Sequence, residues 1–204
     1  MLKLSLITAF VAFAPYTYCG EVDEKFRSSK IVDELIPKPP DSLLDVEFDC
    51  GFTTLGNKFT PLQVRNIPKV TLKGAVESDL YTLIMVDVEV KKEWVHWVVG
   101  NIPGNNIDKG VTLVSFFPSA PPKNSGEHKY VFLLFKQPRK SDYQGQTKIS
   151  TFQMTGRDEF STKTFIDKYK LGTPVAGNFY LAAWDESCVE MYQLVEDYEK
   201  KLKN

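Results

Sequence analysis

The chain has 204 residues, 43% of them hydrophobic, which suffices for one substantial core and indicates a single domain rather than two. Its 25 Lys and Arg residues are balanced by 26 Asp and Glu residues, so the basic excess typical of nucleic-acid-binding proteins is absent and we exclude a nucleic acid partner. The apolar runs are short and rich in Val, Phe, Tyr and Trp, which favours strands over long helices.

Residues 1–19 have the pattern of a secretory signal peptide. Lys3 gives a positive start, an apolar stretch covers 4–14, and Thr17 and Cys19 place small residues where a signal peptidase reads. The stretch is shorter than the ~20 apolar residues that span a bilayer, so we expect no transmembrane segment. An uncleaved N-terminal helix or a short signal anchor is the alternative. We expect a secreted, extracellular protein.

Beyond that segment the chain has two cysteines, Cys50 and Cys188. An even pair in an oxidising compartment is compatible with a disulfide. Two buried free thiols fit equally well, because the sequence does not determine the distance between the two residues. The possible disulfide Cys50–Cys188 therefore stays open.

Residues 20–45 predict an N-terminal helix followed by an extended linker. Apolar residues recur at near-helical intervals and prolines then stop the pattern: Val22, Phe26, Val32 and Ile36, then Pro37, Pro39 and Pro40. From residue 46 onward the pattern predicts mostly strands, at 46–50, 69–73, 80–89, 93–102, 111–116, 128–137 and 175–184. Segments 80–87 and 130–135 are almost continuously apolar, so we expect them to be covered on both faces.

Two further helices are expected near the end of the chain. Asp158 is a candidate cap for a helix that carries Phe165 and ends before Gly172. Asp185 is a candidate cap for the final helix, whose apolar face has Val189, Tyr192, Val195 and Leu202. The segment 117–126 is rich in Pro and Gly, which predicts a loop between two strands.

The two histidines of the chain, His96 and His128, both lie within predicted strands. Strand alternation places Trp94, His96 and Val98 on one face, with Val95, Trp97 and Val99 on the other. Asp87 follows an apolar run, and a carboxylate there is costly to bury unless it is paired. The two imidazoles are its nearest chemical partners.

Several blocks of sequence carry a family resemblance. They are 81–87, 93–104, Pro121-Pro122 and 126–130, with further matches at 60–61, 174–180, 184–185 and Tyr192. In this order and spacing they resemble the phosphatidylethanolamine-binding proteins, which include the Raf kinase inhibitor proteins. The resemblance implies that 46–204 form a mainly β domain, with a β-sandwich core, peripheral and C-terminal helices, and a small head-group pocket.

The resemblance also implies which residues contact a ligand: Asp87, Glu89, His96, Pro121, His128, Tyr130 and Tyr192. In this interpretation His96 and His128 donate to phosphate oxygens while Asp87 orients one of them. The segment 87–90 lacks both prolines of the family pattern, and Glu89 stands where the family has a second aspartate. The loop after segment 87–90 is shorter than in the family, and Lys129 stands where the family usually has an arginine, so the pocket rim must differ.

We therefore expect a secreted, monomeric protein that binds a phospholipid head group or another small anion, without a cofactor and without catalysis. One alternative is a serine-protease inhibitor that uses loops 105–109 and 137–146 as its surface. Another is a polar cluster of Asp87, His96 and His128 whose ligand has been lost. A metal site at these three residues lacks a metal-ligand spacing, and no Gly-x-Ser-x-Gly sequence predicts a hydrolase.

Overall fold

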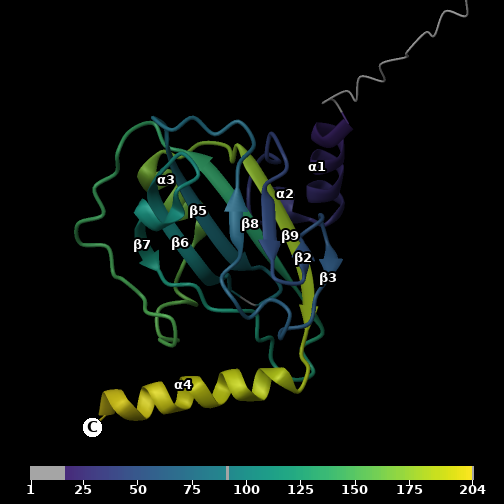
Figure 1. The fold of residues 1–204 in the computed structure, drawn as a ribbon, viewed down its shortest axis with the longest axis vertical. Helices are drawn as coiled ribbons and strands as arrows, with labels where there is room; N and C mark the ends of the chain where they lie inside the picture. Colours follow the sequence, from purple (N-terminus) through teal and green to yellow (C-terminus); the bar gives the residue numbers. More distant parts are fainter. Residues whose placement is uncertain (1–16, 91, 204) are drawn as a thin grey trace, which may run out of the picture.

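The computed structural model describes residues 17–90 and 92–203. The expected signal peptide therefore lies outside the described residues, except for 17–19, which open the first helix. Figure 1 shows the elements in chain order: α1 (Thr17–Ser28), α2 (Ile31–Glu34), β1 (Asp45–Phe48), β2 (Gly51–Phe52), β3 (Asn57–Lys58), β4 (Lys69–Thr71), β5 (Leu80–Asp87), β6 (Trp94–Pro103), the 3-10 helix η1 (Ile107–Lys109), β7 (Val111–Val114), β8 (Glu127–Lys136), α3 (Thr162–Tyr169), β9 (Ala176–Ala183) and α4 (Ser187–Lys203).

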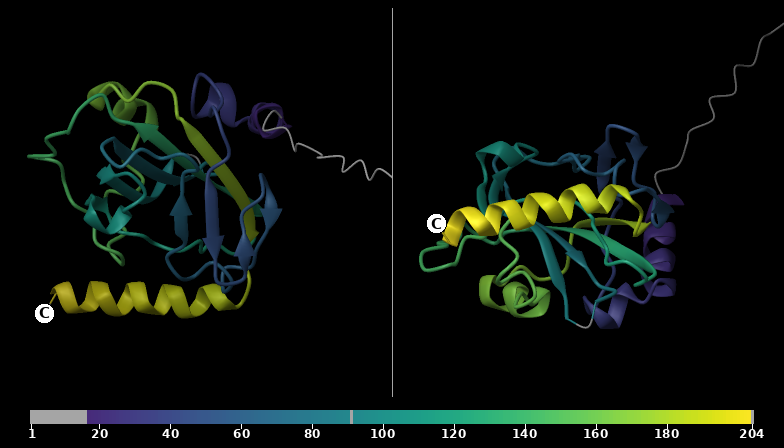
Figure 2. Two further views of the ribbon diagram at one scale, coloured as in Figure 1. Left: turned by 45° about the horizontal axis from the view of Figure 1, so that its top comes forward. Right: turned by 90° about the horizontal axis from the view of Figure 1, so that it is seen from below.

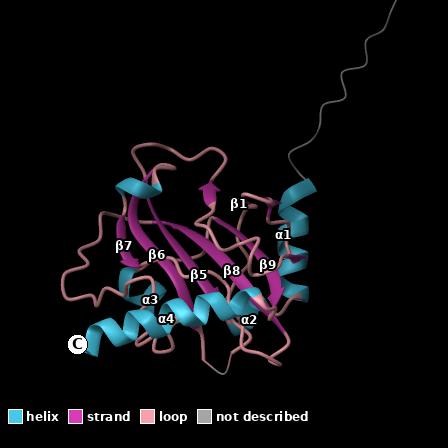
Figure 3. Ribbon diagram, turned by 60° about the horizontal axis from the view of Figure 1, so that its bottom comes forward, coloured by secondary structure: helices cyan, strands magenta, loops and turns pink. Residues whose placement is uncertain are grey.

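The strands form two sheets. The large sheet has the order β3-β9-β8-β5-β6-β7 and is antiparallel except for the β3–β9 pair. The small sheet has the order β2-β1-β4 and is antiparallel throughout. Helices lie at the periphery, and α4 crosses one end of the large sheet (Figures 2 and 3). The expected mainly β fold with peripheral helices is confirmed.

Each face of the large sheet packs against a different layer. On one face Ile84 belongs to a core shared with Phe26 of α1 and Phe165 of α3. On the other face Met85 belongs to a core shared with Val46 of the small sheet. The central strands β5 and β8 are thus buried on both sides, as their apolar runs predicted.

The N-terminal helix is shorter than the apolar spacing predicts. Lys30 has a φ of 59°, and Val32 and Asp33 have non-helical backbone angles inside α2. Ile31, Val32 and Ile36 are all buried in the same core. Burial of three residues so close in sequence requires the chain to turn there, and this tertiary packing overrides the helical pattern.

The capping prediction was wrong for α3 and right for α4. Ser161, rather than Asp158, accepts a hydrogen bond from the Thr164 backbone N–H (3.3 Å), and Glu93 accepts from the Thr162 N–H (2.8 Å). These two acceptors satisfy the amide groups at the start of the helix. At α4, Asp185 accepts from the Ser187 N–H (2.9 Å).

The apolar face predicted for α4 is only partly buried. Val189 and Leu202 are 52% and 68% exposed, whereas Cys188 and Met191 are the residues that enter the core. The helix touches the rest of the fold mainly through its first half. No helix in the described part of the chain is long and apolar enough to cross a bilayer.

Candidate functional site

The candidate site is built at the end of β5, where Asp87 closes the strand. Asp87 lies opposite Trp94 of β6 on one side and opposite Tyr130 of β8 on the other. The residue is only 4% exposed. The strand pairing thus brings together three residues from three separate blocks of sequence.

A β-bulge sets the direction of His96. Val86 pairs with Val95 and Met85 pairs with Trp97, so His96 is an extra residue without a partner on β5. The bulge shifts the alternation. Val95 and Val98 share the helix-side core, while Trp97 packs in the opposite core. Our prediction that Val98 lies on the face of His96 was therefore wrong, because strict alternation allows for no bulge.

A pocket of about 340 Å³ opens above this row of residues. Of the seven predicted ligand contacts, five line it: Asp87, His96, Pro121, Tyr130 and Tyr192. The sequence analysis missed the other lining residues: Val90, Trp94, Phe117, Ala120, Pro122, Met154, Val195 and Glu196. Trp94 was recognisable by its shared face with His96, and Val195 and Glu196 by helical spacing from Tyr192. Met154 lies in a segment without a regular pattern.

His128 and Glu89 do not line the pocket. Nδ1 of His128 donates to Asp87 Oδ2 (2.6 Å), and its Nε2 lies 2.7 Å from Ser125 Oγ. Both ring nitrogens therefore have partners. Glu89 contributes its backbone N–H to Asp87 Oδ1 (2.9 Å), and its carboxylate accepts from Lys129 Nζ (2.7 Å). His128 and Glu89 therefore fix the position of Asp87 and do not line the pocket.

His96 keeps one nitrogen available to the pocket. Its Nδ1 lies 2.7 Å from the Phe117 carbonyl oxygen, which can only accept, so the proton is on Nδ1. Burial lowers the pKa of His96 to about 4 and outweighs the opposite effect of the nearby Asp87 carboxylate. The His96 imidazole therefore carries only one proton at neutral pH. Nε2 is therefore a hydrogen-bond acceptor.

Tyr130 supplies the second polar group of the pocket. Its ring contacts His96 edge to face, with 5.1 Å between centroids, and stacks on Tyr180 at 5.0 Å. Burial raises the pKa of Tyr130 well above its usual value, so the hydroxyl keeps its proton. Within residues 17–90 and 92–203 no hydrogen bond satisfies that hydroxyl. It is free to donate to a ligand.

Helix α4 closes one side of the mouth. The Tyr192 hydroxyl donates to the carbonyl oxygens of Pro121 (2.8 Å) and Ala120 (3.1 Å), which ties the helix to the loop over the pocket. Desolvation raises the pKa of Tyr192 to about 12. Val195 and Glu196 follow one turn later and complete this wall.

Arg157 supports the bulge from the outside of the pocket. Its side chain is fully buried, and its guanidinium donates to six carbonyl oxygens, those of Val95, His96, Ser115, Ser150, Thr151 and Gln153. Desolvation lowers the pKa of Arg157 to about 10, so it stays charged at neutral pH. No pattern in the sequence pointed to this role.

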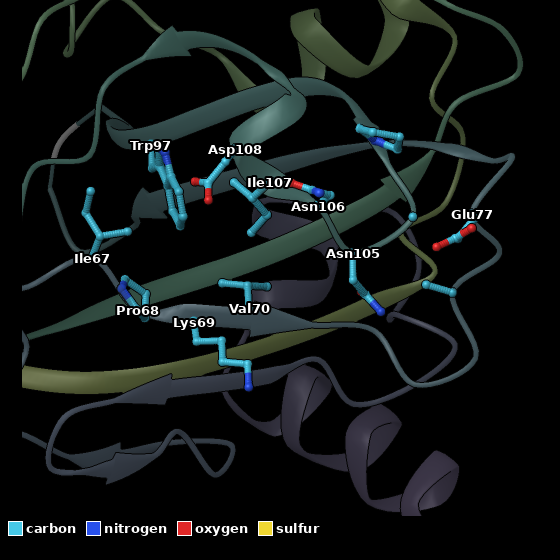
Figure 4. Close-up of a pocket in the computed structure, with 13 residues that line it drawn as sticks. Ile67, Pro68, Lys69, Val70, Glu77, Trp97, Asn105, Asn106, Ile107 and Asp108 are labelled. Atoms are coloured by element: carbon cyan, nitrogen blue, oxygen red, sulfur yellow. The ribbon is translucent and has the colours of Figure 1, made fainter.

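A second pocket, of about 660 Å³, lies at the other end of the same sheet face (Figure 4). It is lined by Trp97 of β6 and residues of β4 and η1, together with charges of both signs: Lys69, Glu77 and Asp108. The loop at 105–109, expected to present a protein surface, borders this pocket through Asn105 to Asp108. None of the seven predicted ligand contacts lies here.

Neither a disulfide nor a metal cluster is found in the described part of the chain. Cys50 is an exposed free thiol and Cys188 a buried one. Of the two possibilities that the sequence left open, the structure has the free thiols, but only Cys188 is buried as that possibility expected. Residues 17–90 and 92–203 contain no group of three or more His, Cys, Asp or Glu side chains arranged to hold a metal ion.

Comparison with known proteins places the chain in a family. The family model for phosphatidylethanolamine-binding protein matches residues 39–180. The chain is 29% identical to the putative odorant-binding protein A5 of Drosophila melanogaster, over 89% of this chain and 91% of that protein. It is 40% identical to the 26 kDa secreted antigen of Toxocara canis, over 76% of this chain but only 62% of that protein.

A solved structure supports the same fold. The carboxypeptidase Y inhibitor, in a structure with its cognate proteinase, superimposes with a TM-score of 0.70 at 23% identity, covering 84% of this chain and 98% of the inhibitor. At that identity the likeness concerns the fold alone. Because the family model matches residues 39–180, well over half of the chain, the chain belongs to the phosphatidylethanolamine-binding protein family.

Proposed function

We propose that the chain is an extracellular binding protein that holds a small molecule in the pocket around His96 and does not transform it. The observation that carries this proposal is the pocket itself. Its volume of about 340 Å³ and its aromatic walls are typical of small-molecule sites, in which a few polar groups orient the ligand. Nε2 of His96 and the hydroxyl of Tyr130 are such groups.

The proposal of binding without catalysis rests on the lining. A covalent mechanism needs a nucleophile beside a base. The described residues that line the pocket include no Ser, Thr, Cys or Lys, and the carboxylate of Asp87 accepts hydrogen bonds from the Glu89 N–H and from His128. His96 is a weak base, with a pKa of about 4, and its proton-bearing nitrogen is committed to Phe117. These side chains favour retention of a ligand over its conversion.

The proposed location and ligand size draw on different observations. Secretion is supported by the signal-peptide pattern and by the relative named a secreted antigen. Another relative is named a putative odorant-binding protein, which is compatible with carriage of a small molecule. The phospholipid head group expected from the resemblance is one candidate ligand, and with a pocket of this size the acyl chains would lie outside.

The test is an NMR titration of the secreted, mature protein, observed through the imidazole protons of its two histidines. Phosphorylethanolamine and benzyl alcohol serve as charged and uncharged probes. We expect saturable shifts at His96 with at least one probe, and smaller shifts at His128, which has no free nitrogen. If neither probe moves the His96 signals at millimolar concentration, the pocket is not the binding site and the proposal fails.

A further inference from the structure

We infer that the open edge of β4 binds an extended peptide segment and favours a basic residue at the centre of that segment. The edge borders the pocket of about 660 Å³ in Figure 4, at the other end of the sheet from the His96 pocket. Peptide binding here is therefore separate from the proposed function. Three features lead to it: unpaired backbone groups at Val70, the walls around this edge, and the charges of Glu77 and Asp108.

The backbone of Val70 points out of the small sheet. In the described part of the chain, β4 is an edge strand that pairs only with β1. The Val46 carbonyl of β1 accepts from the Thr53 N–H on the β2 side, so the residues before and after Val46 turn their backbone groups toward β4. They pair there with Lys69 and Thr71. Val70 lies between these two, so its N–H and C=O point away from β1, and no described residue bonds to them.

A side chain already imitates a strand at the neighbouring position of this edge. The Asn105 amide accepts from the Leu72 N–H (2.8 Å) and donates to the Leu72 carbonyl (3.1 Å). An antiparallel strand makes the same exchange of two bonds with one residue. On the other side of Val70, Pro68 has no N–H to donate. The open stretch is therefore one residue long, and a peptide residue opposite Val70 can make the same two bonds.

The surroundings of this edge admit a free chain segment rather than a folded surface. Val70 lies on one wall of the pocket, while Glu77 and residues 106–108 line it from other segments of the chain (Figure 4). These segments stand in the way of a second folded domain. An extended peptide needs only the strand spacing of about 4.8 Å. Addition of a strand to an open sheet edge is a common mode of peptide recognition.

The peptide side chain opposite Val70 lies among acidic groups. Directly opposed residues of an antiparallel pair have their side chains on the same face, and Val70 packs in the core that contains Trp97. Asp108 and Glu77 line the pocket with Trp97, and neither forms an ion pair within residues 17–90 and 92–203. Lys69 points to the opposite side of β4 from Val70 (Figure 4). A basic residue at the centre of the peptide is therefore favoured over an acidic one.

The test is a titration of the full mature chain with three capped peptides, followed by calorimetry and NMR. The probe is acetyl-Thr-Val-Lys-Val-Thr-amide. A second peptide has Glu at its centre, and a third has a methyl group on the central nitrogen, which removes the donor to the Val70 carbonyl. We expect the probe to bind about fivefold more tightly than the Glu peptide. It should also bind about fivefold more tightly than the methylated peptide, the ratio that one hydrogen bond supplies.

Amide hydrogen exchange reports on the edge itself. On addition of the probe, exchange of the Val70 N–H should slow at least fivefold. The Thr71 N–H already faces β1, so its exchange should stay the same and serves as the internal control.

A variant assigns the charge preference to this pocket. The Asp108 side chain is exposed on η1, so Asp108→Asn removes the charge without disturbing the core. The preference for the Lys peptide over the Glu peptide should then fall from about fivefold to about twofold. Asp167→Asn is the matched control, because Asp167 is exposed on α3 and outside the lining of this pocket, and the preference should remain unchanged.

The indole signals show where the peptide binds, because Trp97 lines this pocket and Trp94 lines the His96 pocket. Shifts at Trp97 together with slower exchange at Val70 support the inference. It is overturned if the three peptides bind alike, if none binds at millimolar concentration, if Trp94 shifts instead, or if Asp108→Asn leaves the preference unchanged. Protection of Val70 that rises with protein concentration alone also overturns it, since the occupant is then a second copy of the chain. The proposed function is decided by the His96 titration and does not depend on these outcomes.

Discussion

The two sides of Asp87 place the same residue type in opposite roles. His96 on β6 and His128 on β8 both flank β5, and both are nearly inaccessible, at 3% and 1% exposure. On the β8 side both imidazole nitrogens have partners, whereas on the β6 side Nε2 has none within the described residues. Burial and residue type therefore do not distinguish the histidine that has a free nitrogen for a ligand. The count of occupied donors and acceptors does.

The difference originates in the backbone. The bulge at His96 turns this residue toward the pocket, beside Phe117. The carbonyl oxygen of Phe117 accepts a hydrogen bond from Nδ1 of His96. His128 instead follows a tight loop in which Ser125 folds back onto Nε2. The following predictions test this contrast, beginning with the largest expected effect.

The strongest test of the β6 side is Arg157→Met. Loss of the guanidinium removes one donor from each of several buried carbonyl oxygens around the bulge, of which that of His96 keeps the Phe117 N–H. We expect the free energy of unfolding to fall by about 4 kcal/mol or more, measured by urea denaturation. Arg139→Met, at an exposed arginine, is the control and should stay within about 0.5 kcal/mol of the wild type. Equal losses in the two variants would show that the bulge does not depend on Arg157.

The protonation of His96 gives the next largest effect. Its pKa is about 4 in the folded protein against about 6.5 when unfolded, so between these values the unfolded chain binds more protons. The stability is therefore fully present above pH 6.5 and is lost as the pH falls toward 4, by about 3 kcal/mol. Urea denaturation across this range should show a shallower pH slope for His96→Asn. Identical slopes would contradict the assignment of this slope to His96.

A smaller effect is expected when Nε2 of His128 loses its partner and becomes unpaired like Nε2 of His96. Ser125→Ala removes the partner of His128 Nε2, and we expect a loss of about 1 kcal/mol in the free energy of unfolding. The His128 imidazole nitrogen signals should shift in NMR spectra while those of His96 stay in place. Ser28→Ala, at an exposed serine remote in sequence, serves as the control. A shift confined to His96 would refute the assignment of partners.

Much of this architecture could be predicted from the sequence, and the predictions that were wrong have identifiable causes. The apolar runs of β5 and β8 predicted strands buried on both faces, since few other environments tolerate such runs. The face of Val98 was predicted wrongly, because a bulge depends on tertiary contacts such as those of Arg157. In the same way, the shared face of Asp87 and the histidines did not reveal which imidazole nitrogens were already occupied.

The smallest effect concerns the hydrogen bonds between α4 and the loop over the pocket, and this pocket lies only on the His96 side of Asp87. Tyr192→Phe removes the hydrogen bonds from α4 to Pro121 and Ala120, but the phenol is partly exposed, so the free energy of unfolding should change by less than about 1 kcal/mol. The local effect should be clearer: amide hydrogen exchange should accelerate in residues 189–196 and remain unchanged in β8. Tyr198→Phe, which loses a bond to Ser150 farther along the helix, is the matched control. Faster exchange in β8 with Tyr192→Phe would mean that the two sides of Asp87 are coupled, and that the contrast between the histidines extends no further than their hydrogen bonds.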